Sequence, residues 1–136
     1  MLAKLTDVLL TAKKEKYAVG LFNTANLEMA RGVIQEAEAL RSPVIVSTAE
    51  VLLSRTPLEN MADLLIPMAK RACVPVVVHY DHGLTFEKCM EALKLGFSSI
   101  MYDCSSDPYE ENVRNVREIT GIAHAFSAAV EAELGS

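Results

Sequence analysis

The residues best suited to chemistry lie in the segment Val76 to Gly83, where an apolar run ends in His79-Tyr80-Asp81-His82-Gly83. Two imidazoles and a carboxylate at this spacing could transfer protons or bind a metal ion. Side chains alternate along a strand, so His79 and Asp81 share one face, and Gly83 allows a turn that aims His82 at the same space. A structural interpretation stays open, because an Asp-His pair at a strand end is also typical of a helix cap beside a surface imidazole.

Length and composition are typical of a single domain. The chain has 136 residues, of which 51% are hydrophobic, enough for one core. Its net charge of -5, without a basic cluster, argues against nucleic acid or an anionic membrane as partner. No segment approaches the ~18 apolar residues of a membrane span, and the amino terminus lacks a signal peptide's apolar core, so we expect a cytoplasmic protein. The three cysteines, Cys73, Cys89 and Cys104, show no close pairing and are expected to be reduced and mostly structural.

The hydrophobic pattern predicts a leading helix, four strand–helix units and a final strand. The predicted strands span residues 17–22, 43–48, 76–83, 98–102 and 128–134. Helical periodicity marks residues 2–16, 27–40 and 86–95, and capping-box patterns open further helices at Thr56 and Asp107. Pro67 is expected to kink or split the helix that begins at Thr56. Strands recur roughly every 25 to 30 residues, a spacing typical of parallel strands joined by right-handed crossovers.

Two α/β architectures accept this order of elements: a doubly wound open sheet, and the first half of a (β/α)8 TIM barrel. In the final strand Glu131 and Glu133 would share one face, and a barrel interior has more room for two carboxylates than a covered sheet. An edge strand with a solvated acidic face remains an alternative. Both architectures place the active site at the carboxyl ends of the strands. These ends carry Asn23, Thr48, Asp81 with His82, Asp103 with Ser105, and Glu133.

Several acidic residues would meet at these strand ends, where the sequence places no lysine or arginine. Buried like charges either raise a pKa or recruit a cation. Because His82 would lie among the carboxylates, a divalent ion held by imidazole and carboxylate ligands is the simplest solution, and zinc suits such ligands. The carboxylates concerned are those of Asp81, Asp103, Glu131 and Glu133.

A series of short segments carries a family resemblance in order along the chain. They are residues 18–23 (Ala18 to Asn23), 42–46, 74–83, 101–105, 110–112 and 130–135. With them, the chain from Met1 to Gly135 resembles the amino-terminal half of the class II, metal-dependent ketose-bisphosphate aldolases. The resemblance implies a partial (β/α)8 barrel over residues 1–136. It also implies a zinc-dependent lyase that cleaves a ketose (bis)phosphate into dihydroxyacetone phosphate and an aldehyde, as in glycolysis. The family further implies a homo-oligomer, dimer or tetramer, and a monovalent cation in the full-length enzyme.

The resemblance also implies roles for individual residues. His82 corresponds to a zinc ligand, and Asp81 to the acid/base that handles the proton on the aldehyde oxygen. Asp103 and Glu133 correspond to positions that hold the metal in an alternate site or line the pocket. Asn23 corresponds to a substrate-contacting amide. His79 is expected to support these ligands from behind, and Glu131 is interpreted as structural.

The chain departs from the family pattern in two respects. The family's two further zinc-binding histidines and its glycine-rich phosphate loops belong to later strands, so we expect this chain to be weakly active or inactive alone and to self-associate, swap or require its missing half. After the second strand, Ala49-Glu50 stands where the family has a hydroxyl or a glycine, which predicts altered specificity, such as a substrate with one phosphate.

A non-catalytic binding module is the alternative function. In a doubly wound module, Asp81 and Asp103 would bind Mg²⁺ or cap helices, and His82 would be incidental. Strand order separates the two interpretations. A barrel places the first strand beside the second and leaves the fifth at an open edge, whereas an open-sheet module places the first strand in the interior.

Overall fold

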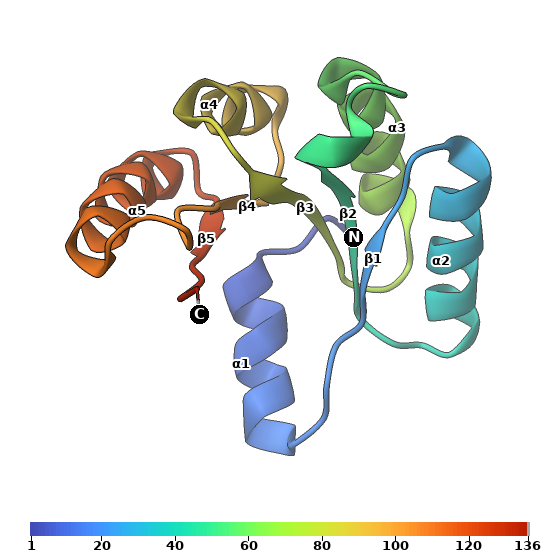
Figure 1. Cartoon of the computed structure of the whole chain (residues 1–136). Helices are drawn as coiled ribbons and strands as arrows, with labels where there is room; N and C mark the ends of the chain where they lie inside the picture. The colour runs from blue at the N-terminus through green and yellow to red at the C-terminus, as the bar shows by residue number, and fades with distance from the viewer. Residues whose placement is uncertain (136) are drawn as a thin grey trace.

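The computed structural model describes residues 1–135 as one layer of parallel strands with helices on both sides (Figure 1). The strands are β1 (Leu21–Asn23), β2 (Val44–Ala49), β3 (Val76–Gly83), β4 (Ser99–Tyr102) and β5 (Ala129–Glu131). The helices are α1 (Leu5–Glu15), α2 (Leu27–Ala39), the short 3-10 helix η1 (Glu50–Leu52), α3 (Leu58–Arg71), α4 (Phe86–Leu95) and α5 (Tyr109–Ala125).

The strands lie in the order in which they occur in the chain. Each pairs in parallel with the next, from β1 to β5, so β1 and β5 form the two edges of the sheet. A doubly wound sheet would place β1 in the interior. The strand order therefore confirms the prediction of a half-barrel and contradicts the doubly wound alternative.

The helices divide between the two faces of the sheet. Figure 1 shows α2, α3, α4 and α5 in an arc along the convex face, while α1 lies on the opposite side. The larger apolar core fills the space between the sheet and the arc, with Val76, Val78 and Tyr80 of β3 fully buried in it. A smaller core joins Leu5 of α1 to Val77 on the concave face. β3 is therefore buried on both faces, as its unbroken apolar run predicted.

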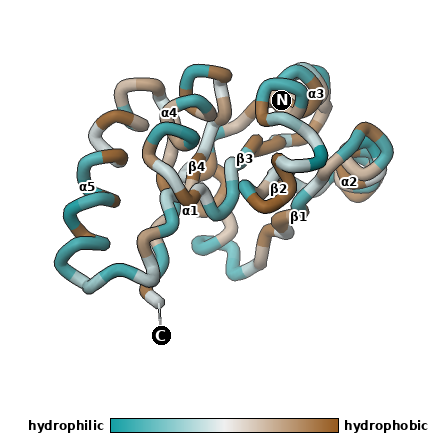
Figure 2. The backbone as a smooth tube through the Cα atoms, turned by 45° about the horizontal axis from the view of Figure 1, so that its top comes forward, coloured by the Kyte–Doolittle hydropathy of each residue, from teal (hydrophilic) through white to brown (hydrophobic). Residues whose placement is uncertain are grey.

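The pattern of hydropathy along the chain agrees with these layers. Figure 2 shows hydrophobic residues along β2, and turns of alternating hydrophobic and hydrophilic residues on α5. Such alternation is what a helix needs when one side packs on a sheet and the other meets water. No helix among residues 1–135 is long and apolar enough to cross a membrane.

Some local expectations were wrong. The helix predicted from Thr56 begins at Leu58 without a side-chain cap, because the Thr56 hydroxyl instead donates to the carbonyl of Ala25 at 2.8 Å. The same helix, α3, runs unbroken through Pro67. The predicted Asp107 capping box also fails, since α5 begins after Pro108 with no side-chain cap. By contrast, Thr85 caps α4, accepting from the Lys88 amide at 3.3 Å. 

The final strand is shorter than predicted. β5 ends at Glu131, so Glu133 follows the strand and does not share its alternation. The Asn112 side chain of α5 donates to the backbone carbonyl of Glu133 at 2.8 Å and fixes this segment after the strand. The position of Glu133 is thus set by a contact with α5.

Candidate active site

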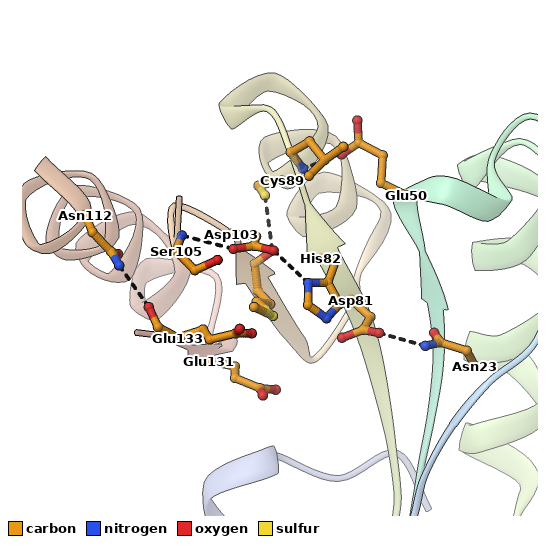
Figure 3. A network of polar contacts seen from close by, with 12 residues as sticks. Asn23, Glu50, Asp81, His82, Cys89, Asp103, Ser105, Asn112, Glu131 and Glu133 are labelled. Carbon is orange, nitrogen blue, oxygen red and sulfur yellow. Dashed lines mark hydrogen bonds and ion pairs between the residues drawn. The ribbon is translucent and has the colours of Figure 1, made fainter. Parts of the chain in front are cut away.

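The polar residues at the carboxyl ends of the strands converge on the concave side of the sheet. Figure 3 shows side chains from β1, β3 and the segments that follow β4 and β5 directed toward one region. They fall into two groups that share β3: one is centred on Asp81, and the other on His82.

A β-bulge in β3 determines how His82 is presented. Tyr80 pairs with Ile100 and Gly83 with Tyr102, so β3 has one residue more than β4 across this interval. His82 occupies this bulge with a left-handed φ of 45°, and its side chain is 48% exposed in a strand that is otherwise buried. The bulge therefore turns His82 out of the regular alternation of the strand.

Gly83 contributes space, and this corrects the expectation that its flexibility turns the chain. The positive φ belongs to His82 and not to Gly83. A Cβ added at Gly83 would lie 2.6 Å from Cys89 Sγ and 2.8 Å from the carbonyl oxygen of Met101. The absence of a side chain lets the bulge pack directly against β4 and α4.

The first group consists of His82, Asp103 and Glu133. His82 Nδ1 donates to Asp103 Oδ2 at 2.7 Å, and Asp103 Oδ1 accepts from the backbone amide of Ser105 at 3.0 Å. One potential ligand atom from each of His82, Asp103 and Glu133 lies within 4.8 Å of the others. The structure thus brings together the three residues predicted to bind metal.

The electrostatics of this group favour the charged forms of His82 and Asp103. The bond to Asp103 raises the pKa of His82, and the charges of Asp81, Asp103 and Glu133 add to this effect. Partial burial tends to raise the pKa of Asp103, but the bonds from His82 and Ser105 outweigh it and lower the pKa overall. The cluster is a negative site that suits a cation.

The second group surrounds Asp81, which is 8% exposed. Its Oδ2 accepts from Asn23 Nδ2 at 2.7 Å, and Asn23 Oδ1 accepts from the hydroxyl of Ser47 at 2.9 Å. His79 Nε2 lies 3.7 Å from Asp81 Oδ1 and 3.4 Å from Glu131 Oε2. His79 and Asp81 therefore share one face of β3, as alternation predicted.

The neighbours of Asp81 keep it ionised. The imidazole of His79 is the main cause that lowers the pKa of Asp81, and the Asn23 amide adds to it against the effect of burial. His79 is itself completely buried, and its Nδ1 lies 2.8 Å from the hydroxyl of Ser99. Asp81 is thus a carboxylate oriented by a hydrogen bond from Asn23 of β1, with the buried His79 imidazole beside it at 3.7 Å.

Two contributors to this region were missed by sequence reasoning. Asn112, which is 5% exposed, holds the segment of Glu133, and its burial at a helix start had no visible sequence signal. Glu50 was considered only as part of a changed segment that alters specificity. Its Oε2 instead accepts from the hydroxyl of Tyr80 at 2.8 Å and from the backbone amide of Leu84 at 2.6 Å. A tyrosine within a buried strand needs such an acceptor, so Tyr80 itself indicated in the sequence that a polar partner lies nearby.

The donor set of the first group fits a zinc ion in part. One imidazole and two carboxylates are suitable zinc ligands, but a tetrahedral site commonly takes three or four protein ligands that include several nitrogens or sulfurs. Within residues 1–135 no second imidazole belongs to the cluster. The three side chains therefore offer part of a zinc ligand set.

Comparisons with known proteins agree with the fold and the order of these segments. The family model described as fructose-bisphosphate aldolase class-II matches residues 3–136. The fructose-bisphosphate aldolase of Thermus caldophilus is 38% identical over 135 residues, which cover 99% of this chain and 44% of that protein. The 6-phospho-5-dehydro-2-deoxy-D-gluconate aldolase of Shouchella clausii is 37% identical over 137 residues, covering 97% of this chain and 46% of that protein.

A solved structure shows the same architecture. The crystal structure of the YdjI aldolase from Escherichia coli K12 superposes with a TM-score of 0.95 at 38% identity, covering 99% of this chain and 52% of that one. The chain spans about half the length of the relatives it matches. The five parallel strands with their helices correspond to the amino-terminal portion of these barrels. The chain therefore belongs to the family of class II fructose-bisphosphate aldolases.

Proposed function

We propose that this chain supplies the acid/base and part of the metal site of a zinc-dependent aldolase. The reaction is the reversible cleavage of a ketose phosphate into dihydroxyacetone phosphate and an aldehyde. One observation carries the proposal: on adjacent residues of β3, an oriented Asp81 carboxylate stands beside the cluster of His82, Asp103 and Glu133. A carboxylate for proton transfer next to a cation site is the combination that carbon–carbon bond cleavage at a ketose requires.

His82, Asp103 and Glu133 would hold the ion. Bound there, a divalent ion would supply Lewis-acid polarisation of a ketone carbonyl. In the structure the bond between His82 Nδ1 and Asp103 keeps the imidazole beside the carboxylates that would share the ion with it. A monovalent cation near the substrate phosphate is part of the same proposal for the full-length enzyme.

Asp81 would move the proton of the cleaved bond. During cleavage it accepts the proton of the ketose hydroxyl that becomes the aldehyde oxygen, and during condensation it returns that proton. The lowered pKa of Asp81 provides the ionised form that cleavage needs. Asn23 holds Asp81 through Oδ2 and lies at the exposed end of β1, where its amide would also meet substrate. His79 supports Asp81 from the buried side.

The substrate of the proposed reaction carries at least one phosphate. Among the relatives, the enzyme of Shouchella clausii is named for a substrate with a single phospho group, and that of Thermus caldophilus for a bisphosphate. Ala49 ends β2 without a hydroxyl, and the Glu50 carboxylate beside it is bonded to Tyr80 and Leu84. We favour a substrate with one phosphate, because Ala49, the last residue of β2, offers no hydroxyl to a second.

The edges of the sheet indicate that the chain works within a larger assembly. Beside β1, a groove of about 420 Å³ is lined by apolar residues that include Phe22, Val33 and Leu40. Beside β5, one of about 510 Å³ includes Val116 and Leu134. Unpaired parallel edges with apolar borders favour association. A homo-oligomer is therefore part of the proposal, and the free cysteines suit a reducing compartment, the cytoplasm.

Zinc binding and aldol cleavage test this proposal separately. Calorimetric titration of the chain with Zn²⁺ should give weak binding of at most one ion per chain, because the cluster supplies one imidazole and two carboxylates. H82A should abolish that binding, whereas H124A, which alters an exposed histidine in the last turn of α5, should not. The activity readout is the release of dihydroxyacetone phosphate from ketose mono- and bisphosphates in a coupled assay.

The same assay examines the acid/base role. In an enzyme that also holds the remaining strands of the barrel, D81A should lower the cleavage rate by about 10²- to 10⁴-fold, the usual contribution of a positioned acid/base. Cleavage that persists in D81A, or that is insensitive to removal of zinc by a chelator, would contradict the proposal. Equal rates on mono- and bisphosphates would contradict the preference for one phosphate.

A further inference from the structure

The Glu50 side chain holds the segment of β3 on both sides of His82. Its Oε2 accepts from the hydroxyl of Tyr80 at 2.8 Å and from the backbone amide of Leu84 at 2.6 Å. Tyr80 lies two residues before His82, and Leu84 two residues after it. One carboxylate oxygen from the end of β2 thus joins the two ends of the bulge in β3.

The bulge is a segment that needs such support. His82 has a left-handed φ of 45°, a conformation that residues other than glycine adopt only when the surrounding structure imposes it. Regular pairing with β4 is interrupted between Tyr80 and Gly83, and Leu84 is exposed beyond the end of the strand. The Leu84 amide therefore has no acceptor in the β3–β4 ladder, and it bonds to Glu50 instead.

Glu50 is itself well anchored for this purpose. It is the first residue of η1, directly after Ala49, which pairs with Asp81 in the β2–β3 ladder. Tyr80 is completely buried, so its hydroxyl needs an acceptor inside the protein. Burial and the bond to Glu50 raise the pKa of Tyr80, which keeps the hydroxyl protonated and able to donate.

We propose that Glu50 is a positioning residue, which fixes the backbone of the bulge so that the His82 imidazole faces Asp103 and Glu133. Glu50 acts through the backbone of β3 and does not itself hold the ion. The inference rests on the metal site proposed above and deepens it. Glu50 stands where the family has a hydroxyl or a glycine, and under this proposal it helps to build the site.

Four variants of the chain test this inference: E50A, E50Q, Y80F and E36A. E50A removes the acceptor, E50Q keeps an acceptor oxygen without the charge, and Y80F removes one donor while leaving the Leu84 bond. E36A is the matched control, because it removes the same charge from an exposed position on α2. For each variant we would measure Zn²⁺ affinity by calorimetry, thermal unfolding by circular dichroism, and exchange of the Leu84 amide by NMR without added metal.

E50A is expected to weaken Zn²⁺ binding about 10- to 100-fold, the usual effect of removing a group that orients a ligand. The Leu84 amide should exchange at least about tenfold faster, since its acceptor is lost. E50Q should restore most of both properties, Y80F should be intermediate, and E36A should match the unchanged chain. A purely structural role would lower the unfolding temperature without this order of Zn²⁺ affinities.

The results separate this inference from the proposed function. Unchanged Zn²⁺ affinity or unchanged Leu84 exchange in E50A overturns the positioning role of Glu50. If the unchanged chain binds no Zn²⁺, the proposed metal site fails, and Leu84 exchange alone decides whether Glu50 holds the segment. If E50A does not fold, Y80F decides, and Zn²⁺ affinity in Y80F equal to that of the unchanged chain overturns the inference.

Discussion

Replacement of Gly83 by alanine should destabilise the protein through a clash at the bulge. The added Cβ would lie 2.6 Å from Cys89 Sγ and 2.8 Å from both the Met101 carbonyl oxygen and Tyr80 Cε1. The Cys89 side chain can give way, but Met101 contributes backbone of β4, and Tyr80 is completely buried. Overpacking of a core by one methyl group against groups that cannot move costs about 1–3 kcal/mol. We expect G83A to lie at the upper end of that range.

The same substitution at Gly32 provides a matched control with the opposite sign. Gly32 lies within α2, and a Cβ there would meet no atom within 4 Å. Alanine is favoured over glycine in a helix by roughly 1 kcal/mol, so G32A should be stabilising.

Chemical denaturation at one fixed protein concentration measures both changes, because association would shift the apparent stability. The expected difference between the two variants is about 3–4 kcal/mol, the sum of the clash and the helix effect. A G83A variant as stable as the unchanged chain would refute the close packing of the bulge. If G32A were equally destabilising, the loss in G83A would reflect a general intolerance of alanine. Removal of the movable neighbour in G83A/C89A should recover part of the loss, whereas the clash with Met101 remains.

Two further predictions concern the thiols and the sheet edges. Burial raises the pKa of Cys89 to about 12, so at pH 8 only about 10⁻⁴ of this thiol is ionised, and iodoacetamide should label exposed Cys73 first. Cys89 should become reactive as the pH approaches 12 or when the chain unfolds, and rapid labelling of Cys89 at pH 8 in the folded chain would contradict its burial. The chain should also sediment as a dimer or larger species at micromolar concentration, because the β1 and β5 edges are unpaired within residues 1–135. A stable monomer would refute that expectation.

The segment of β3 was predictable because its signals are local. The apolar run and the following polar residues gave the bounds Val76 to Gly83, which the structure confirms. The common face of His79 and Asp81 follows from the two-residue repeat of any strand, and the structure confirms it as well. The strand order followed from the spacing of strand–helix units together with the family resemblance.

Features that depend on contacts between distant residues were not predictable in the same way. Glu133 was placed on a strand by alternation, but β5 ends at Glu131, and Asn112 holds the segment from α5. Thr56 looked like a helix cap until its hydroxyl was found to bond a loop 31 residues away in sequence. In both cases a short pattern had two physically acceptable partners, and only the packed fold selects one.

The bulge in β3 also allows two consecutive residues to serve the two halves of the proposed site. In an unbroken strand, Asp81 and His82 would point to opposite faces, whereas the extra residue lets consecutive side chains serve neighbouring groups. Their α-carbons are joined by one trans peptide bond, which fixes the separation at about 3.8 Å. Fluctuations of the surrounding helices therefore cannot separate the backbone anchors of the proton-transfer carboxylate and the metal-binding imidazole. Their spacing is therefore a property of covalent geometry.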